Sequence, residues 1–208
     1  MGAKYKQKFA GTFGLAGCLS FYPTKSLGAF GDAGAVITNN KEFAEKIRAI
    51  RNHGRSSGTD ISFWGLNCRM DTLNAAILDF KLTKLPEWIK RRREIAKIYN
   101  DRLIGLKELK LPLSPEVKSD YYNVFQNYEL EAEKRNELVD FLNINGIEVM
   151  LPWGGKGVHQ ITALGQNKFI LPRTDDFFKK VLILPIYPEL DNKQVKYIAD
   201  MIKKFYLH

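Results

Sequence analysis

The chain has 208 residues, of which 45% are hydrophobic, and a formal net charge of +9. This length allows one large domain or two small ones. No apolar run is long enough for a membrane span, and no charged-then-apolar signal sequence opens the chain. The positive charge leaves nucleic acid, an anionic membrane surface or a phosphorylated small ligand as possible partners.

The two cysteines, Cys18 and Cys68, lie in unrelated contexts and lack the spacing of metal ligands. We expect both thiols to be reduced and buried, with no metal site, in a cytoplasmic protein.

The first part of the chain predicts strands followed by a helix. The basic, weakly alternating residues 5–11 are typical of a hairpin, and apolar residues predict strands over 19–22 and 33–38. Asn40 is a candidate N-cap for a helix that ends at Arg51. Residues 53–65, which include Gly54, Ser56 and Gly58, predict a loop.

The middle of the chain predicts two helices separated at Pro86. The first begins at Met70 or Asp71, and Pro86 is expected to end it because proline has no N–H to donate. The second runs to about Leu103. We interpret these helices as the bridge between a first domain, residues 1–84, and a second domain, residues 85–208. One side of the first helix is apolar, with Leu73, Ala76, Ile77 and Phe80.

The last part of the chain predicts a layer of strands covered by helices. Strands are expected over residues 124–130, 147–151 and 181–184. A helix over 131–145 is expected to end at Gly146 as its C′ residue, and a terminal helix to cover 192–206.

Basic residues crowd the segment 90–97, where an apolar stripe shares the same helix. The stripe favours the interpretation that the charges form a solvated face. Nucleic-acid binding is the lesser alternative, since no recognition motif or aromatic stacking platform accompanies the charges. The basic residues are Lys90, Arg91, Arg92, Arg93 and Lys97, and the stripe is Ile89, Ile95, Ala96, Ile98 and Tyr99.

The segment from Ser20 to Lys25 is the strongest candidate for a catalytic site. Pro23 stops the strand that begins at residue 19, so Lys25 lies on a tight loop at a strand end. A lysine held there can act as an amine nucleophile, and the Ser20 hydroxyl is close enough to share an anionic ligand. Taken alone, a loop lysine is more often a solvated charge.

Three segments in the same order resemble the DegT/StrS-type sugar aminotransferases, which are fold-type I enzymes that use pyridoxal phosphate (PLP). The first is Ser20-Phe21-Tyr22-Pro23-Thr24-Lys25 with Gly28, Gly31 and Gly34. The second is Arg51-Asn52-His53-Gly54 with Gly65-Leu66-Asn67-Cys68-Arg69-Met70, and the third is Leu184-Pro185-Ile186-Tyr187-Pro188-Glu189-Leu190.

The resemblance assigns roles to individual residues. It implies that Lys25 forms the Schiff base with PLP and moves the proton, that Ser20 binds the PLP phosphate, and that Asn67 reaches this phosphate from a neighbouring subunit. The alternative for Asn67 is a turn-forming residue. His53 is assigned either to substrate binding or to the capping of a helix end. His159 is assigned to substrate binding, because it lies in the segment 150–160, which faces the substrate in the family. In this chain that segment departs from the family pattern. Lysine at position 25, where sugar dehydratases of the superfamily carry histidine, favours transamination.

The resemblance also implies the fold and the partners. We expect an α/β chain that corresponds to the C-terminal half of such an enzyme, namely a remnant of the large PLP-binding domain followed by a small α+β domain. The expected reaction transfers an amino group from glutamate to a nucleotide-linked ketosugar. We expect a homodimer or another form of self-association, and the chain alone is expected to be inactive. The alternative is a non-catalytic basic binding module, which would not need Lys25 in this frame.

Overall fold

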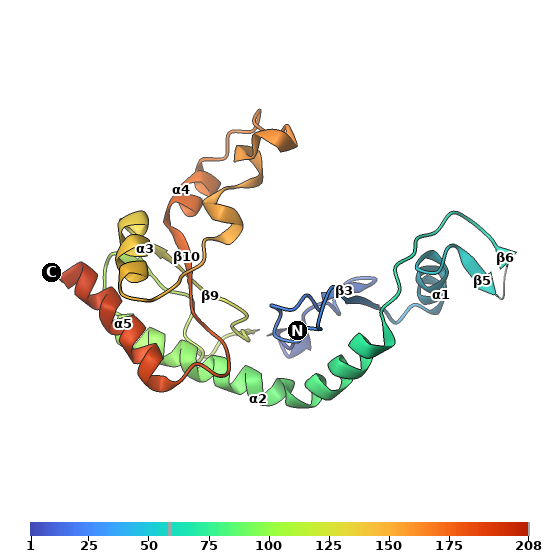
Figure 1. The fold of residues 1–208 in the computed structure, drawn as a ribbon, viewed down its shortest axis with the longest axis horizontal. Helices are drawn as coiled ribbons and strands as arrows, with labels where there is room; N and C mark the ends of the chain where they lie inside the picture. The colour runs from blue at the N-terminus through green and yellow to red at the C-terminus, as the bar shows by residue number, and fades with distance from the viewer. Residues whose placement is uncertain (58–59, 208) are drawn as a thin grey trace. The chain divides into compact units, whose positions relative to one another are not determined.

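The computed structural model describes residues 1–57 and 60–207, and contacts divide the chain into two compact units (Figure 1). Unit 1 comprises Met1–Ile89 and Ser119–Val124, and unit 2 comprises Lys90–Lys118 and Phe125–His208. None of the helices in the described part of the chain is long and apolar enough to cross a membrane.

The described residues of unit 1 form three small antiparallel sheets. Strand β1 (Lys4–Tyr5) pairs with β2 (Lys8–Phe9) and with β8 (Tyr121–Tyr122), which confirms the expected hairpin near the start of the chain. Strand β3 (Gly17–Ser20) pairs with β4 (Gly34–Ile37), close to the two predicted strands. The end of β3 at Ser20 agrees with the position of Pro23, which cannot continue a ladder.

Helix α1 (Lys41–Ile50) begins as the sequence predicts. The Asn40 side chain accepts a hydrogen bond from the Phe43 N–H over 2.9 Å, so it satisfies one of the unpaired donors of the first turn. The loop prediction that follows is only partly right, because β5 (Arg55–Ser57) and β6 (Asp60–Ile61) form a short hairpin there. Gly58, which was part of that prediction, lies outside the described residues.

Helix α2 (Thr72–Leu103) is one continuous helix, so the predicted break at Pro86 is wrong. Proline removes one hydrogen bond from the helix interior. Burial of Leu85 and Ile89 on either side of Pro86 opposes this loss, because those turns are held by packing.

The buried side of α2 in unit 1 is not its most apolar side. Leu78, Leu85 and Ile89 pack with Phe21 and Leu27 in the core of this unit. The side that the sequence singled out is largely exposed, with Leu73 and Phe80 in solvent.

Unit 2 is built around a three-stranded antiparallel sheet. Strand β9 (Tyr128–Ala132) lies between β7 (Leu109–Lys110) and β10 (Val181–Leu184), and every residue of β10 is buried. Buried residues of helices α3 (Arg135–Ile144) and α5 (Asn192–Leu207) complete the core.

The sequence located most of these elements in unit 2. The strand over 181–184 and the terminal helix are confirmed, and Gly146 has the positive φ of 74° expected of a C′ residue. The helix predicted from residue 131 begins only at Arg135, because residues 128–132 extend the sheet. Of the strand predicted over 147–151, one isolated bridge forms, between Met150 and Ile183.

A segment of short helices connects the sheet to α4 (Pro172–Lys180), which the sequence prediction missed. The signal for α4 is Pro172, since proline is favoured at the first position of a helix. The short helices are η1 (Pro152–Gly155), η2 (Val158–Gln160) and η3 (Thr162–Leu164).

The prediction that the basic residues of α2 form a solvated face is wrong for its arginines. Arg92 is only 7% exposed, and its Nη1 donates to the carbonyl oxygens of Ile186 at 2.8 Å, Gln126 at 3.2 Å and Phe125 at 3.3 Å. Burial lowers the pKa of this guanidinium, and the charge of Glu189 opposes the shift. Arg92 therefore ties the helix to two loops of unit 2.

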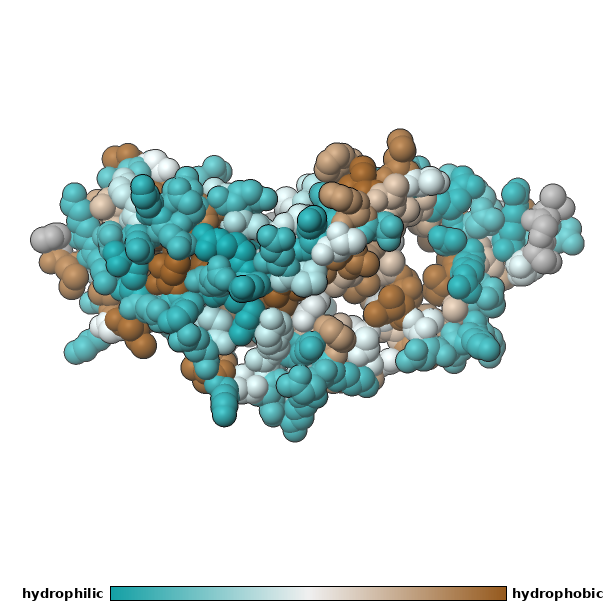
Figure 2. Space-filling model, turned by 90° about the horizontal axis from the view of Figure 1, so that it is seen from below, coloured by the Kyte–Doolittle hydropathy of each residue, from teal (hydrophilic) through white to brown (hydrophobic). Residues whose placement is uncertain are grey.

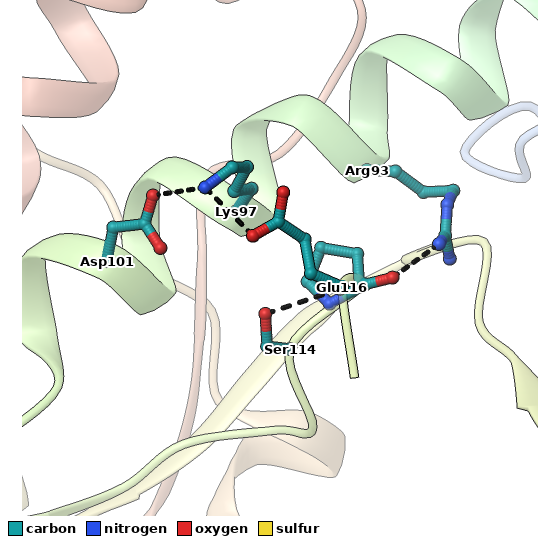
Figure 3. A network of polar contacts seen from close by, with 6 residues as sticks. Arg93, Lys97, Asp101, Ser114 and Glu116 are labelled. Carbon is teal, nitrogen blue, oxygen red and sulfur yellow. Dashed lines mark hydrogen bonds and ion pairs between the residues drawn. The ribbon is translucent and has the colours of Figure 1, made fainter. Parts of the chain in front are cut away.

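The neighbouring charges are also used within unit 2 (Figure 3). Arg93 donates to the carbonyl oxygen of Pro115 over 2.7 Å. Lys97 forms ion pairs with Asp101 at 2.7 Å and with Glu116 at 3.1 Å. Much of the positive charge of this segment therefore holds the helix to the loop around residues 114–116.

The expectation of buried thiols is wrong, because Cys18 and Cys68 are both exposed. Cys18 lies at an exposed position of β3. Hydrophobic residues are exposed elsewhere as well, and Figure 2 shows several of them among the hydrophilic surface residues.

Candidate functional site

The candidate catalytic lysine lies on the connection between β3 and β4. Ser20 is the last residue of β3, and its hydroxyl accepts a hydrogen bond from the Tyr22 N–H over 3.3 Å. The Lys25 N–H donates to the Tyr22 carbonyl over 2.8 Å, which closes a turn at Pro23. Ser20 and Lys25 thus lie five residues apart at the same strand end.

The loop is tight, and α2 braces it. A Cβ atom at Gly28 would clash with the Pro23 carbonyl, so only glycine fits there. Lys81 of α2 donates to the Gly28 carbonyl oxygen over 2.7 Å, and Asn74 accepts from the Phe30 N–H over 3.2 Å.

The sequence analysis missed both of these bracing residues. Their signal was the spacing of Asn74, Leu78 and Lys81 on one side of a helix, because residues seven apart lie two turns apart. Leu78 between them is buried against the same loop region.

Ser20 and Lys25 are both exposed, so their side chains are accessible to a ligand. No carboxylate of the described residues forms an ion pair with Lys25. The amino group of Met1 has its pKa lowered, first by burial and next by the positive charge of Lys25. An exposed amine on the same short connection as a hydroxyl is a group that can bind a carbonyl compound with an anionic group.

A second pair of candidate residues meets in unit 1. Asn52 and Asn67 form an isolated antiparallel bridge, and the His53 N–H donates to the Leu66 carbonyl over 2.9 Å. His53 therefore lies on the strand-like segment next to that of Asn67.

The pairing of the segments around Asn52 and Asn67 depends on close backbone packing. His53 has a positive φ of 62°, and a Cβ at Gly54 would clash with the Phe63 carbonyl. Asn67 is exposed. Among the described residues, no hydrogen bond or ion pair joins His53 or Asn67 to Ser20 or Lys25.

His159 belongs to unit 2 and is not open to a substrate. It is 8% exposed, and its Nε2 lies 2.7 Å from Oδ1 of Asp175 on α4. Gln160 donates to the same oxygen over 2.6 Å and accepts from the Gly157 N–H over 2.9 Å. The arrangement is that of a side chain that fixes η2 to α4.

The residues on the lysine loop fit part of what PLP needs. The Lys25 amine can bond to its aldehyde and the Ser20 hydroxyl can donate to its phosphate. No group of three or more possible metal ligands occurs among the described residues.

The fold and this loop define an α/β chain with an accessible lysine at a strand end. The sequence model of the DegT/DnrJ/EryC1/StrS aminotransferase family matches residues 1–203. The chain belongs to this family, as its sequence motifs indicated. Membership implies dependence on PLP.

Individual relatives agree with this placement. The chain is 40% identical to a "Pleiotropic regulatory protein" of Geobacillus stearothermophilus, a match that covers 100% of this chain and 56% of the relative. It is 33% identical to the UDP-N-acetyl-3-dehydro-alpha-D-glucosamine 3-aminotransferase of Acidithiobacillus ferrooxidans. That match covers 98% of this chain and 54% of the relative.

Among solved structures, the chain is similar to DesV of S. venezuelae, with a TM-score of 0.92 and 34% identity. This likeness covers 100% of the chain and 56% of DesV. The chain therefore spans about half the length of the relatives it matches. It has the fold of part of a fold-type I aminotransferase, and a non-catalytic basic module is not favoured.

Proposed function

We propose that the chain is the lysine-bearing part of a PLP-dependent aminotransferase that transfers an amino group from glutamate to a nucleotide-linked ketosugar. The observation that supports this most directly is the exposed Lys25 on a braced loop beside Ser20, in a member of an aminotransferase family. Because the chain spans about half of its relatives, we infer that activity needs the polypeptide that supplies the remaining length.

Each residue of the loop receives one task in this proposal. When bound, PLP supplies the electron sink that transamination requires. Lys25 Nζ attaches the cofactor and carries the proton between the two carbon atoms that gain and lose it. The Ser20 hydroxyl binds the phosphate, and the bracing of Gly28 by Lys81 keeps both groups on a fixed loop.

We further propose a homodimer in which Asn67 binds the PLP phosphate held by the partner subunit. The bridge to Asn52 holds Asn67 in place, and its side chain is exposed. In this proposal residues 1–84 are the remnant of the PLP-binding domain and residues 85–208 the small domain. His53, next to Asn67 in the paired segments, is assigned to the substrate, and His159 is assigned to positioning of the segment near it.

Reduction with borohydride in the presence of PLP tests the role of Lys25. We expect a covalent adduct on the peptide that contains Lys25, found by mass spectrometry of a digest of the full-length gene product and of the 208-residue chain. Lys25→Ala should abolish this adduct. Lys84→Ala is the matched control, because Lys84 is also an exposed lysine of unit 1 and should not affect labelling.

The position of the adduct decides the result. An adduct on Lys81 or Lys84 with Lys25 unmodified would show that the catalytic assignment is wrong.

The affinity for PLP tests the role of Asn67. Hydrogen bonds to a charged phosphate are worth about 1.5–3 kcal/mol. We therefore expect Asn67→Ala to weaken PLP binding by roughly ten- to a hundredfold in the full-length dimer. Unchanged affinity, measured by absorbance titration, would remove Asn67 from the site.

A further inference from the structure

The connection that carries Lys25 is closed where it returns to the sheet. The Ala29 N–H donates to the Phe21 carbonyl oxygen over 2.8 Å, so residues 21–29 form a loop whose ends are joined. Leu27 and Ala29 are 3% and 1% exposed, whereas Lys25 is exposed. The loop therefore presents the amine to solvent while its second half is packed in the core of unit 1.

Two side chains of α2, Asn74 and Lys81, hold the chain at the point where it leaves this loop, and we call them the clasp. Lys81 Nζ donates to the Gly28 carbonyl oxygen over 2.7 Å. The Asn74 side chain accepts a hydrogen bond from the Phe30 N–H over 3.2 Å. These two contacts lie on either side of Ala29, whose own N–H closes the loop. Three consecutive residues are thus fixed through their backbone groups.

The ammonium of Lys81 makes a second contact, with the ring of Phe30. Nζ lies 4.8 Å from the ring centroid, within the range in which a cation is attracted to a ring face. The ring face and the Gly28 carbonyl oxygen both carry partial negative charge, so both contacts depend on the positive charge as well as on the length of the side chain. An ammonium in these contacts has no lone pair with which to attack a carbonyl carbon.

The clasp acts on the turn at Lys25 through Gly28. A Cβ atom at Gly28 would clash with the Pro23 carbonyl, so the backbone of Gly28 lies directly against this turn. The Lys25 N–H closes the turn by donating to the Tyr22 carbonyl oxygen over 2.8 Å. Because these backbones are in contact, a shift of Gly28 would also shift the turn and change the position of the Lys25 amine relative to Ser20 at the strand end.

We propose that Lys81 is a positioning residue whose positive charge, held between the Gly28 carbonyl and the Phe30 ring, keeps the Lys25 amine and the Ser20 hydroxyl in the arrangement that PLP requires. A fixed arrangement favours the reaction because the aldehyde and the phosphate can then be bound at the same time. The inference rests on the proposed function. It gives two lysines of unit 1 different tasks, since Lys25 bonds to the cofactor and Lys81 does not.

Borohydride reduction of the 208-residue chain with a limiting amount of PLP tests the proposal. The quantity measured is the fraction of the total adduct that Lys25 carries, found by mass spectrometry of a digest. We expect Lys81→Met, which keeps the length of the side chain but removes its charge, to lower this fraction by about tenfold, because the amine is no longer held in position. Lys81→Arg keeps the charge and the donors and should retain most of the labelling. Lys84→Met is the matched control, an exposed lysine three residues further along α2, and should change the fraction by less than about twofold.

Hydrogen exchange of individual amides, measured by NMR without PLP, separates positioning from general stability. Lys81→Met should speed the exchange of the Ala29 and Phe30 N–H groups by about tenfold, because the loop end opens more often. The amides paired between β3 and β4 should exchange as in the wild type. Asn74→Ala removes the other half of the clasp and should act in the same direction on the Phe30 N–H. Faster exchange throughout β3 and β4 would show a general loss of stability and would contradict the positioning role.

The labelling results distinguish this proposal from the proposed function. Equal labelling of Lys25 in the wild type and in Lys81→Met would reject the positioning role alone. Loss of labelling in Lys81→Arg as complete as in Lys81→Met would show that the charge is not what matters, which also contradicts the proposal. The absence of any adduct on Lys25 in the wild type would reject the aminotransferase proposal and the positioning role together.

Discussion

Unit 2 buries a continuous core around its sheet, whereas unit 1 buries a small one and leaves apolar residues of α2 exposed. The core of unit 2 includes Leu182 and Leu184 of β10, together with buried residues of α3 and α5. The core of unit 1 joins the lysine loop to a single side of α2. The difference indicates that unit 2 supplies most of the folding free energy, because stabilisation follows buried apolar area.

The two units also use charge differently. In unit 2, arginines such as Arg92 and Arg135 are buried and bound to backbone carbonyls. In unit 1, Lys25 is exposed and has no carboxylate partner among the residues described. Unit 2 therefore uses these arginines to hold loops in place, whereas Lys25 of unit 1 is left accessible to solvent.

The largest expected effect is the loss of a core side chain in unit 2. Leu182→Ala should lower the free energy of unfolding by about 4 kcal/mol, because Leu182 is fully buried and the change leaves a cavity. Leu78→Ala in unit 1 should cost only about 2 kcal/mol, since its surroundings can relax more. Both losses of stability can be measured by urea denaturation, with hydrogen exchange used to follow each unit separately. Equal losses for the two variants would contradict the view that unit 2 is the more stable unit.

The second effect concerns the buried guanidinium. Arg92→Met should lower the stability of unit 2 by about 2–3 kcal/mol, since it removes the donor to three backbone carbonyls. Lys90→Met is the control, because Lys90 is an exposed residue of the same helix. If the two variants had the same urea midpoint, Arg92 would be the solvated charge that the sequence suggested.

A smaller, local effect is expected at the contact between η2 and α4. Asp175→Ala removes the acceptor shared by His159 and Gln160 and should cost about 1–2 kcal/mol. Faster hydrogen exchange confined to residues 157–175 is the expected result. Asp176→Ala serves as the control, and faster exchange throughout unit 2 would show that this contact belongs to the core.

The smallest effect lies in unit 1, at the start of α1. Asn40→Ala should cost about 1 kcal/mol, because the Phe43 N–H loses its capping acceptor. Asn39→Ala, one residue earlier, should have no measurable effect. Thermal unfolding followed by circular dichroism distinguishes the two variants by their helix content. The same unfolding curve for Asn40→Ala and Asn39→Ala would argue against the cap.

Several features followed from the sequence because they depend on neighbouring residues alone. The Asn40 cap, the Gly146 helix end and the buried strand 181–184 are set by side-chain chemistry and apolar patterning within a few residues. The motif around Lys25 is also local, and its family placement was confirmed by the match over residues 1–203.

Tertiary structure alone decided the features that depend on distant partners. Pro86 continues a helix because burial on either side outweighs one lost hydrogen bond, and no local pattern reveals that burial. Arg92 and His159 are indistinguishable in sequence from solvated or ligand-binding residues. Their roles follow from carbonyls and a carboxylate that only folding brings within hydrogen-bond distance.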